Sequence, residues 1–461
     1  MTTTVPVLRD VPFSDPFETI RKGMRLLSPE VGIIRELGGG VHFAGDPECF
    51  VIGNHCCDPS RFSRQPHHRD RSGSAGLEVE HALAAAIGEA VERYCMRFYW
   101  DDQLVFGSYR ELSKKHELVH PALSRLHTQE QIDARSATSI GGSIRQVVFD
   151  EDTPIRWTWG LSLTEQRPKL VPAHMVYLPY RTQEGEARAG WNSSTGLAAG
   201  NTLEEAVLTG ISEWVERDAF VICWLNRGIP RRIEVDDPVV GRMLEERFQV
   251  GDPRVDLRIF DTTLDIRIPS ILVWMRRPMD FGQGNFVGAA CRSTPRGACT
   301  KALIELAQCV PYARISLQQH EAWVPREDFT DIWSFELHAI FYMKRPDLIE
   351  ESFRFMAEAP VEGKLSDLPD VSTGRVLGDV DTMVAELGRH GYEVLVVDLT
   401  TEDVREVGLH AVRVVVPGLQ NLHGNHNWPC LAVERTYSVP SMLGWQPHGP
   451  ESLNPFPHPF P

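Results

Sequence analysis

Two stretches of the chain repeat the same pairing of carboxylates at helical spacing. The first pair is Glu89 and Glu92, and the second is Glu213 and Glu216, 124 residues further along. Residues at positions i and i+3 share one face of a helix, so each pair projects two carboxylates in one direction. If the two helices face each other, the four carboxylates meet and need cations beside them. Oxygen ligands of this kind suit Mg²⁺, which usually binds together with phosphates.

A weaker third copy places Glu305 where Glu89 lies and Gln308 where Glu92 lies. The first two copies also match in the phase of their apolar residues, and an arginine (Arg93 or Arg217) follows the second glutamate of each. A repeat of this length indicates a duplicated supersecondary unit. The alternative is three unrelated amphipathic helices with solvated Glu-Arg faces, since one Glu-x-x-Glu-Arg sequence is common on helix surfaces.

The composition is that of an ordinary globular protein and limits the classes of partner. The 461 residues carry a net charge of −16 with a pI near 5.5, which argues against binding along a nucleic-acid backbone or on an anionic membrane. No apolar run reaches about 18 residues, so no membrane span is expected. The nine cysteines include no Cys-x-x-Cys pair, which indicates reduced thiols and a cytoplasmic location.

The paired carboxylates require helices, and the sequence predicts three of them, at about residues 78–98, 202–220 and 295–309. Thr202 has the side chain of an N-cap for the second helix. Each helix follows one or two strand-like segments. This order predicts an α/β fold built from repeated strand–helix units.

Composition and periodicity assign the rest of the chain. We expect an N-terminal arm over residues 1–25 and one domain over residues 26–461. Strands are expected at 31–37 and 42–52, and the polar, Gly/Ser-rich residues 58–76 are expected to form a mobile loop. The later segments are a helical layer at 325–358, a C-terminal α/β part at 379–420 and a Pro-rich tail at 455–461. Alternating prolines exclude helix and central strand, so the tail should be an extended strap.

Familiar nucleotide and zinc motifs are missing from the sequence. The Walker pattern Gly-x-x-x-x-Gly-Lys-[Ser/Thr] does not occur, so an ATP site would have to be a cradle of carboxylates and Mg²⁺. His423-Gly-Asn-His426 followed by Cys430 has poor spacing for zinc and is interpreted as a loop.

The acidic motifs resemble those of the YcaO family, and best match the stand-alone cyclodehydratase (D) proteins of thiazole- and oxazole-modified peptide biosynthesis. The motifs are Ala85-x-x-x-Glu89-x-x-Glu92-Arg93, Asn201-x-x-x-Glu205-x₇-Glu213-x-x-Glu216-Arg217, Lys301-x-x-x-Glu305-x-x-Gln308 and the terminal Pro-x-Pro-x-Pro. The resemblance extends over residues 30–461. It implies a YcaO-type fold whose repeated units surround a central ATP cavity.

The resemblance also implies roles for individual residues. The magnesium ligands would be Glu89, Glu92, Glu213, Glu216 and Glu305. The nucleotide contacts would be Arg93, Asn201, Glu205, Arg217, Lys301 and Gln308. Two positions depart from the usual family pattern: Ala85 replaces Ser, and Lys301 replaces Arg or Gln. Lysine neutralises a phosphate but cannot grip it with two parallel hydrogen bonds as arginine does.

The implied reaction takes place on a ribosomal precursor peptide. A Cys, Ser or Thr side chain attacks the preceding backbone carbonyl, ATP phosphorylates the resulting amide oxygen, and phosphate leaves to give a thiazoline or oxazoline. Phosphoryl transfer of this kind depends mainly on positioning and charge neutralisation. The terminal carboxylate of Pro461 would act as the base or align it.

Two other functions fit the same residues. A related YcaO reaction would form a thioamide or amidine, with sulfide or an amine as nucleophile. A non-catalytic docking subunit would only scaffold a peptide-modifying complex, although the intact set of glutamates argues against this. The resemblance implies a leader-binding partner of the E1-like, ocin-ThiF-like type, a dehydrogenase in the same pathway, and a homodimer. No leader-binding module is recognised in the chain itself.

Overall fold

Each of the three acidic helices begins directly after a β-strand, in agreement with the predicted order of elements. The computed structural model describes residues 7–58, 60, 71–138, 146–190, 193–228, 231–446 and 448–460. The strand–helix pairs are β3 (Arg71–Gly76) with α2 (Val79–Cys95), β7 (Leu197–Gly200) with α6 (Leu203–Asn226), and β11 (Gly282–Cys291) with α8 (Pro295–Gln319).

The turn from strand to helix is tight in the first two units and requires glycine at the same repeat position. Gly76 ends β3 and Gly200 ends β7. A Cβ atom on these glycines would lie 2.5 Å from the backbone nitrogen of Ala82 and 2.8 Å from that of Ala206. Only a residue without a side chain lets the two backbones approach so closely.

The second and third acidic helices start where the sequence predicts and end later. Thr202 accepts a hydrogen bond from the backbone N–H of Glu205 (3.2 Å), which confirms the expected N-cap. α6 continues past residue 220 because its last turns are buried. α8 continues past residue 309 and through Pro311. Proline removes one helical hydrogen bond, and the buried side chains of Val310 and Ala313 hold the helix together across it.

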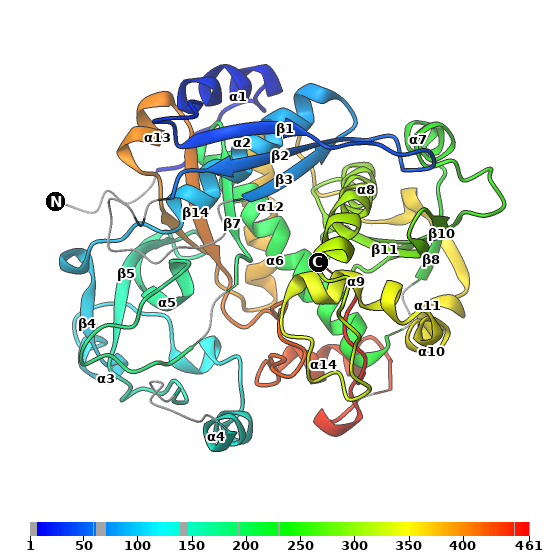
Figure 1. Ribbon diagram of the computed structural model, residues 1–461. Coiled ribbons are helices and arrows are strands. Elements are labelled where there is room, and N and C mark those ends of the chain that lie inside the picture. The colour runs from blue at the N-terminus through cyan, green and yellow to red at the C-terminus, as the bar shows by residue number, and fades with distance from the viewer. Residues whose placement is uncertain are drawn as a thin grey trace.

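Three sheets carry these helices (Figure 1). The first is antiparallel, with β1 (Ile34–Gly39), β2 (Phe50–Cys56) and β3 in that order. The second has the order β11-β10-β9-β8-β12, with β10 (Ser270–Met279), β9 (Asp256–Asp261), β8 (Arg231–Glu234) and β12 (Val361–Lys364). The third has the order β4-β5-β13-β14-β7, with β4 (Val105–Gly107), β5 (Ile155–Ser162), β13 (Leu395–Asp398) and β14 (His410–Val415), and β6 (Arg167–Pro172) beside β5.

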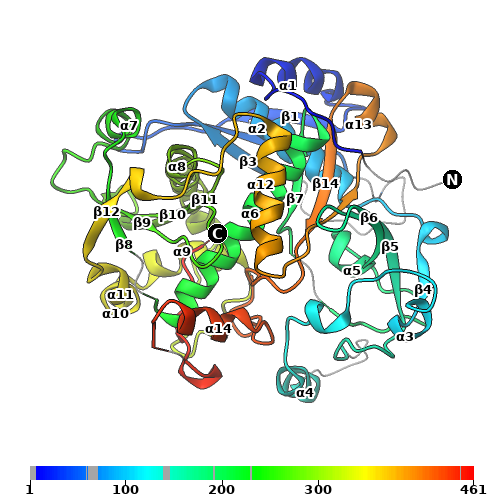
Figure 2. The same ribbon diagram turned by 180° about the vertical axis from the view of Figure 1, so that it is seen from behind.

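α6 lies at the centre of the molecule and joins the sheets (Figure 1). It packs on β14 and β7 of the third sheet and reaches β11 of the second, while α2 covers the first sheet and α8 covers β10 and β11. α12 (Val376–Arg389) runs along α6 on the side shown in Figure 2. A helix enclosed in this way is buried around most of its circumference, as α6 is. The three acidic helices therefore converge on one central region.

Shorter helices complete the fold. They are α1 (Pro16–Gly23), α3 (Tyr109–Leu112), α4 (Gln129–Thr138), α5 (Ala173–Val176), α7 (Pro238–Phe248), α9 (Phe335–Lys344), α10 (Ile349–Ser352), α11 (Arg354–Ala357), α13 (Glu402–Val407) and α14 (Arg435–Met442). Among the residues that the structure describes, no helix combines the length and apolar character needed to cross a bilayer.

Several sequence expectations about local structure are wrong. The strand expected at 42–52 is β2, which starts only at Phe50. Residues 71–76 of the expected mobile loop form β3, because the backbone of this polar segment pairs with β2 although it lacks apolar alternation. Residues 59 and 61–70 of that loop lie outside the described residues. The helical layer expected at 325–358 is divided into α9, α10 and α11, with a break at Pro346.

The expected N-terminal arm is part of the fold over its described residues. Gly23 at the end of α1 lies so close to α2 that a Cβ atom would meet Ile87 at 2.3 Å. Ahead of α1, the backbone N–H of Ser14 donates to the Glu205 carboxylate of α6 (2.6 Å). The segment therefore bridges the middle of α2 and the first turn of α6.

The Pro-rich tail runs as an extended segment through the interior, held by its backbone carbonyls. Trp224 Nε1 donates to the carbonyl of Phe456 (3.1 Å), and Tyr342 Oη donates to that of Pro457 (2.6 Å). Its His458 stacks on His338 of α9, with 3.8 Å between ring centres. The expectation of an extended strap is confirmed for residues 455–460.

His458 is hydrogen-bonded as a neutral imidazole. Its Nε2 donates to the carbonyl of His423 (2.7 Å), and its Nδ1 accepts from the backbone N–H of Phe460 (3.3 Å). His338 Nδ1 donates to the carbonyl of His458 (2.9 Å). Burial, with Arg217 and His426 nearby, lowers the pKa of His458 to about 3. Protonation would break the bond to Phe460 and place a buried charge against the neutral ring of His338.

Acid should therefore loosen the tail. The unfolded His458 has a pKa of about 6.5 and takes up a proton below that pH, whereas the folded protein keeps it neutral down to about 3. The free energy of unfolding thus falls as the pH drops below about 6.5, by about 1.4 kcal/mol per unit for this residue. Urea titrations at pH 7.5 and pH 5.0 give the change in the free energy of unfolding between these two values. The wild type should lose about 2 kcal/mol more than His458→Gln. An equal loss in both proteins would contradict the neutral assignment.

Candidate active site

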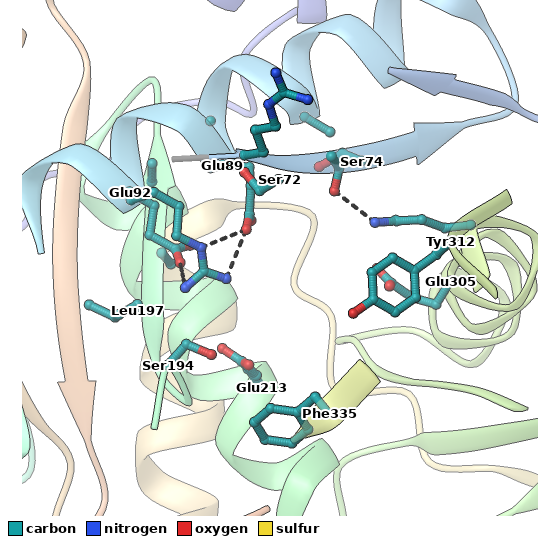
Figure 3. A pocket seen from close by; sticks show the side chains of 18 of the residues that line it. Ser72, Ser74, Glu89, Glu92, Ser194, Leu197, Glu213, Glu305, Tyr312 and Phe335 are labelled. Carbon is teal, nitrogen blue, oxygen red and sulfur yellow. Dashed lines mark hydrogen bonds and ion pairs between the residues drawn. The ribbon is translucent and has the colours of Figure 1, made fainter. Parts of the chain in front are cut away.

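A cavity of about 1560 Å³ opens where α2, α6, α8 and β3 meet (Figure 3). All but one of the site residues suggested by the sequence line it: Glu89, Glu92, Arg93, Asn201, Glu205, Glu213, Glu216, Arg217, Lys301, Glu305 and Gln308. The exception, Pro461, lies outside the described residues, and its neighbour Phe460 lines the cavity.

The carboxylates of α2 and α6 converge, as the helical spacing predicts. Glu89 and Glu92 point from α2 toward Glu213 on α6, with Glu305 of α8 on the far side (Figure 3). Burial and the neighbouring charge of Glu89 raise the pKa of Glu92 well above its usual value. Burial raises the pKa of Glu216 to about 7. The negative charges of Glu213 and Glu305 add to this rise, and the positive charge of Arg217 opposes it. Burial and the neighbouring carboxylates therefore disfavour the charged forms of Glu92 and Glu216, which a bound cation would favour.

Each acidic helix also carries a cation that pairs with its own glutamates. Arg93 pairs with Glu89 (Nη2–Oε1 2.8 Å) and Glu92 (Nη1–Oε1 3.4 Å). The repeat places Arg217 beside its own two glutamates in the same way, at 3.6 and 3.4 Å. Burial opposes the charged form of Glu305, but the Lys301 ammonium at 2.5 Å and other cations hold its pKa below the usual value. Each helix thus supplies both a carboxylate and a cation.

Arg413 of β14 is a further cation that the sequence reasoning missed. It is buried and donates from Nη1 to the carbonyl of Ser193 (2.9 Å). Burial lowers its pKa to about 10, and the carboxylates of Glu213 and Glu92 oppose that shift. The signal was present in the sequence as a lone charge in the apolar strand Val412-Arg-Val-Val-Val.

The first turn of α6 forms one end of the cavity. Glu205 is held by backbone N–H groups of Ser14 (2.6 Å) and Asn201 (3.2 Å). The side-chain amide of Asn201 donates to Thr19 of α1. Its Oδ1 is buried and accepts no hydrogen bond. A hydrogen-bond donor of a bound ligand would satisfy this open acceptor.

Small residues form much of the cavity wall. They are Gly38, Gly39, Gly40, Gly53, Gly73, Ala84, Ala85, Ala199 and Gly200. They come from β1 and the residue after it, and from β2, β3, α2 and β7. Backbone without large side chains leaves a slot beside the carboxylates. The Ala85 that departs from the family pattern lies in this slot.

β3 is the other part of the site that sequence reasoning missed. Arg71, Ser72 and Ser74 line the cavity from a segment expected to be a mobile loop. Gln308 of α8 fixes this strand, donating from Nε2 to the carbonyl of Gly73 (2.7 Å). Gln308 therefore replaces the second glutamate of the motif with a group that bonds the protein itself.

The residues fit a nucleotide with Mg²⁺ better than a metal alone. Within the described ranges, no three His, Cys, Asp or Glu side chains are close enough together to hold a metal ion. Mg²⁺ usually keeps several waters and uses one or two carboxylates with phosphate oxygens. The clustered carboxylates, their paired cations and the open acceptor of Asn201 fit that requirement.

Comparisons with known proteins agree with this geometry. A solved structure described as a heterocyclase in complex with substrate and cofactor has 26% sequence identity and a TM-score of 0.78, and covers 99% of this chain. YcaO from Methanopyrus kandleri, bound with AMPPCP and Mg²⁺, has 22% identity and a TM-score of 0.60, with 91% of this chain and 95% of that one covered. The latter likeness concerns the fold alone.

An uncharacterized protein of Methanothermobacter thermautotrophicus is 28% identical over 280 residues, which are 59% of this chain and 67% of that protein. The chain spans only 59% of the length of the heterocyclase. The α/β fold matches those of this heterocyclase and of the Methanopyrus kandleri YcaO, as expected from the sequence. The model of the family described as YcaO cyclodehydratase, ATP- and Mg²⁺-binding, matches residues 73–420. The chain belongs to the YcaO family, and ATP and Mg²⁺ are the cofactors of that family.

Proposed function

We propose that this chain is an ATP- and Mg²⁺-dependent cyclodehydratase that activates a backbone amide of a ribosomal precursor peptide. Cys, Ser or Thr residues of the peptide would become thiazolines or oxazolines. One observation supports this above others: three repeated helices bring five glutamates and three cations into a single cavity, which the Pro-rich tail also enters. The match to a heterocyclase over almost the whole of this chain favours azoline formation.

The residues of the cavity divide into three groups. Glu89, Glu92, Glu213, Glu216 and Glu305 would hold magnesium. Arg93, Arg217 and Lys301 would neutralise phosphate charge. Asn201 and Glu205 would contact the nucleoside, and Gln308 would keep β3 against it. When bound, ATP supplies the phosphoryl group that turns the amide oxygen into a leaving group, and these residues hold and orient it.

Pro461 is proposed to stand beside the reacting amide. The guanidinium of Arg217 lies over the ring of Phe460, 4.4 Å from its centre. Phe460 also packs against Phe220 of α6, with 4.8 Å between ring centres. Residue 461 follows directly on this anchored ring. The tail is thereby directed to the same helix that carries Glu213 and Glu216.

The mass of the peptide product tests the proposal. A precursor peptide incubated with the chain, ATP, Mg²⁺ and an E1-like leader-binding partner should lose one water for each residue cyclised. Exchange of oxygen for sulfur, with sulfide supplied, would establish thioamide formation instead. Absence of ATP turnover with every peptide and partner would favour the docking subunit. Omission of the partner should reduce turnover sharply, because the proposed enzyme relies on it to capture the leader.

Mg²⁺ should stabilise the protein only when nucleotide is present. The carboxylates alone do not form a complete metal site, and phosphate oxygens and waters are needed to complete an octahedron. Thermal unfolding should shift by several degrees with Mg²⁺ and a non-hydrolysable ATP analogue together, and little with either alone. Tight Mg²⁺ binding in calorimetry, indifferent to nucleotide, would instead indicate a structural metal site.

A further inference from the structure

We propose that the cavity contains a subsite for a large apolar side chain of the peptide, next to the residue that is cyclised. The subsite is the apolar shelf formed by Tyr312 and Ile315 of α8 with Trp333 and Phe335 at the start of α9. This inference deepens the proposed function and rests on it, since it concerns the peptide substrate of the same cavity.

The cavity is too large for a nucleotide alone. Pockets for one small ligand occupy about 300–1,000 Å³, whereas this cavity has about 1560 Å³. The remainder leaves room for a second ligand. The proposed reaction supplies one, because the peptide amide has to reach the phosphate.

The shelf exposes large apolar groups that folding alone would bury. Trp333 is 64% exposed and Ile315 is 54% exposed, and both line the cavity. Tyr312 and Phe335 point into the same space as Glu213 and Glu305 (Figure 3). Exposed apolar groups that gather at a cavity mark a binding surface. They are suited to receive a Leu-, Phe- or Trp-sized side chain.

The adenine ring belongs at the opposite end. Ala199 and Gly200 line the cavity beside Asn201 without large side chains, and the open Oδ1 of Asn201 could accept a hydrogen bond from the amine of the base. The phosphates must lie at the carboxylates and cations. With the nucleoside on the Asn201 side of that cluster, the shelf on α8 and α9 is left for the peptide.

The tail approaches from the shelf side. Phe335 faces the ring of His458, with 6.3 Å between ring centres, and His338 and Tyr342 of the same helix hold the tail backbone. The tail therefore contacts α9, the helix whose start forms part of the shelf. A side chain seated on the shelf would place its neighbouring amide near Phe460.

Photo-crosslinking tests the placement. The probe is a synthetic hexapeptide with benzoyl-phenylalanine immediately before a cysteine, irradiated with the full chain, Mg²⁺ and a non-hydrolysable ATP analogue. We expect adducts within residues 312–319 and 333–336, and at least tenfold fewer when the benzophenone is moved to the far end of the peptide. Adducts elsewhere would overturn the proposal. A second sample is irradiated without the ATP analogue. If labelling occurs there and is lost when the analogue is added, the shelf binds the base and the proposal is also overturned.

A pair of matched tryptophan variants tests the specificity. Hexapeptides with Leu before the cysteine should bind about tenfold more tightly than those with Ala, because a hydrophobic pocket discriminates by about this much. Trp333→Ala should reduce that ratio to below about threefold, while Trp100→Ala, a similarly exposed residue away from the cavity, should retain it. An unchanged ratio in Trp333→Ala would refute the subsite. A normal ratio with a product that has not lost water would refute cyclodehydration and leave the subsite standing.

Discussion

Glu213→Gln and Glu216→Gln will each reduce peptide-dependent ATP hydrolysis at least about a hundredfold, while the thermal unfolding curve changes little. Loss of one group that stabilises transition-state charge typically costs about 10²–10³ in rate. Folding should be spared because glutamine has the same shape. In the case of Glu216, the change also removes a buried carboxylate whose pKa burial raises to about 7.

The comparison needs turnover and stability on the same samples. Glu245→Gln on α7, an exposed glutamate away from the cavity, serves as the matched control and should behave as the wild type. If either cluster variant kept its specific activity and lost its fold, the glutamates would be structural and the site assignment would fail.

Removal of residues 457–461 should abolish cyclisation while the affinity for ATP changes far less. The deletion takes away Phe460, which lies between Arg217 and Phe220, and the residue proposed to act on the amide. Asn201 and Glu205, which are proposed to contact the nucleoside, line the other end of the cavity and remain, whereas Arg217 loses the ring beneath it. The measurements are the rate of water loss from the peptide by mass spectrometry and nucleotide affinity by calorimetry.

A milder variant distinguishes the positioning of the tail from its packing in the core. Tyr342→Phe removes the hydroxyl that donates to the carbonyl of Pro457 and that also bonds Ser352, and it keeps the buried ring. It should lower the cyclisation rate by a smaller factor, about tenfold for a loss of about 1.4 kcal/mol. Wild-type cyclisation by the truncated protein would exclude the tail from the mechanism.

The part of the site that depends on helix geometry was accessible from the sequence. The i, i+3 spacing of Glu89/Glu92 and Glu213/Glu216 and their repetition predicted which side chains share a cavity, and the structure places them there. The strand directly before the first helix was not predicted, because β3 lies in the segment expected to be a mobile loop. The assignments of fold, family and cofactors then followed from the motifs.

The rest depended on contacts between distant segments. β3 has a polar sequence and becomes a strand only because β2 offers it a backbone partner. The shelf combines Tyr312, beyond a proline that suggested a helix end, with Trp333, twenty-one residues later. Arg413 shows as a lone charge in an apolar strand, but its proximity to Glu213 depends on the packing of β14 against α6.

The continuity of α6 has a consequence for how such chains can diverge. Glu213 and Trp224, which holds the tail backbone, lie on one unbroken helix. Their separation along the axis is about 17 Å, at about 1.5 Å per residue. Insertion of one residue between them would turn Trp224 by about 100° and misdirect the tail. Changes in chain length during evolution should therefore avoid this stretch of helix and accumulate in the connection before α9, where an added residue alters only the shape offered to the peptide.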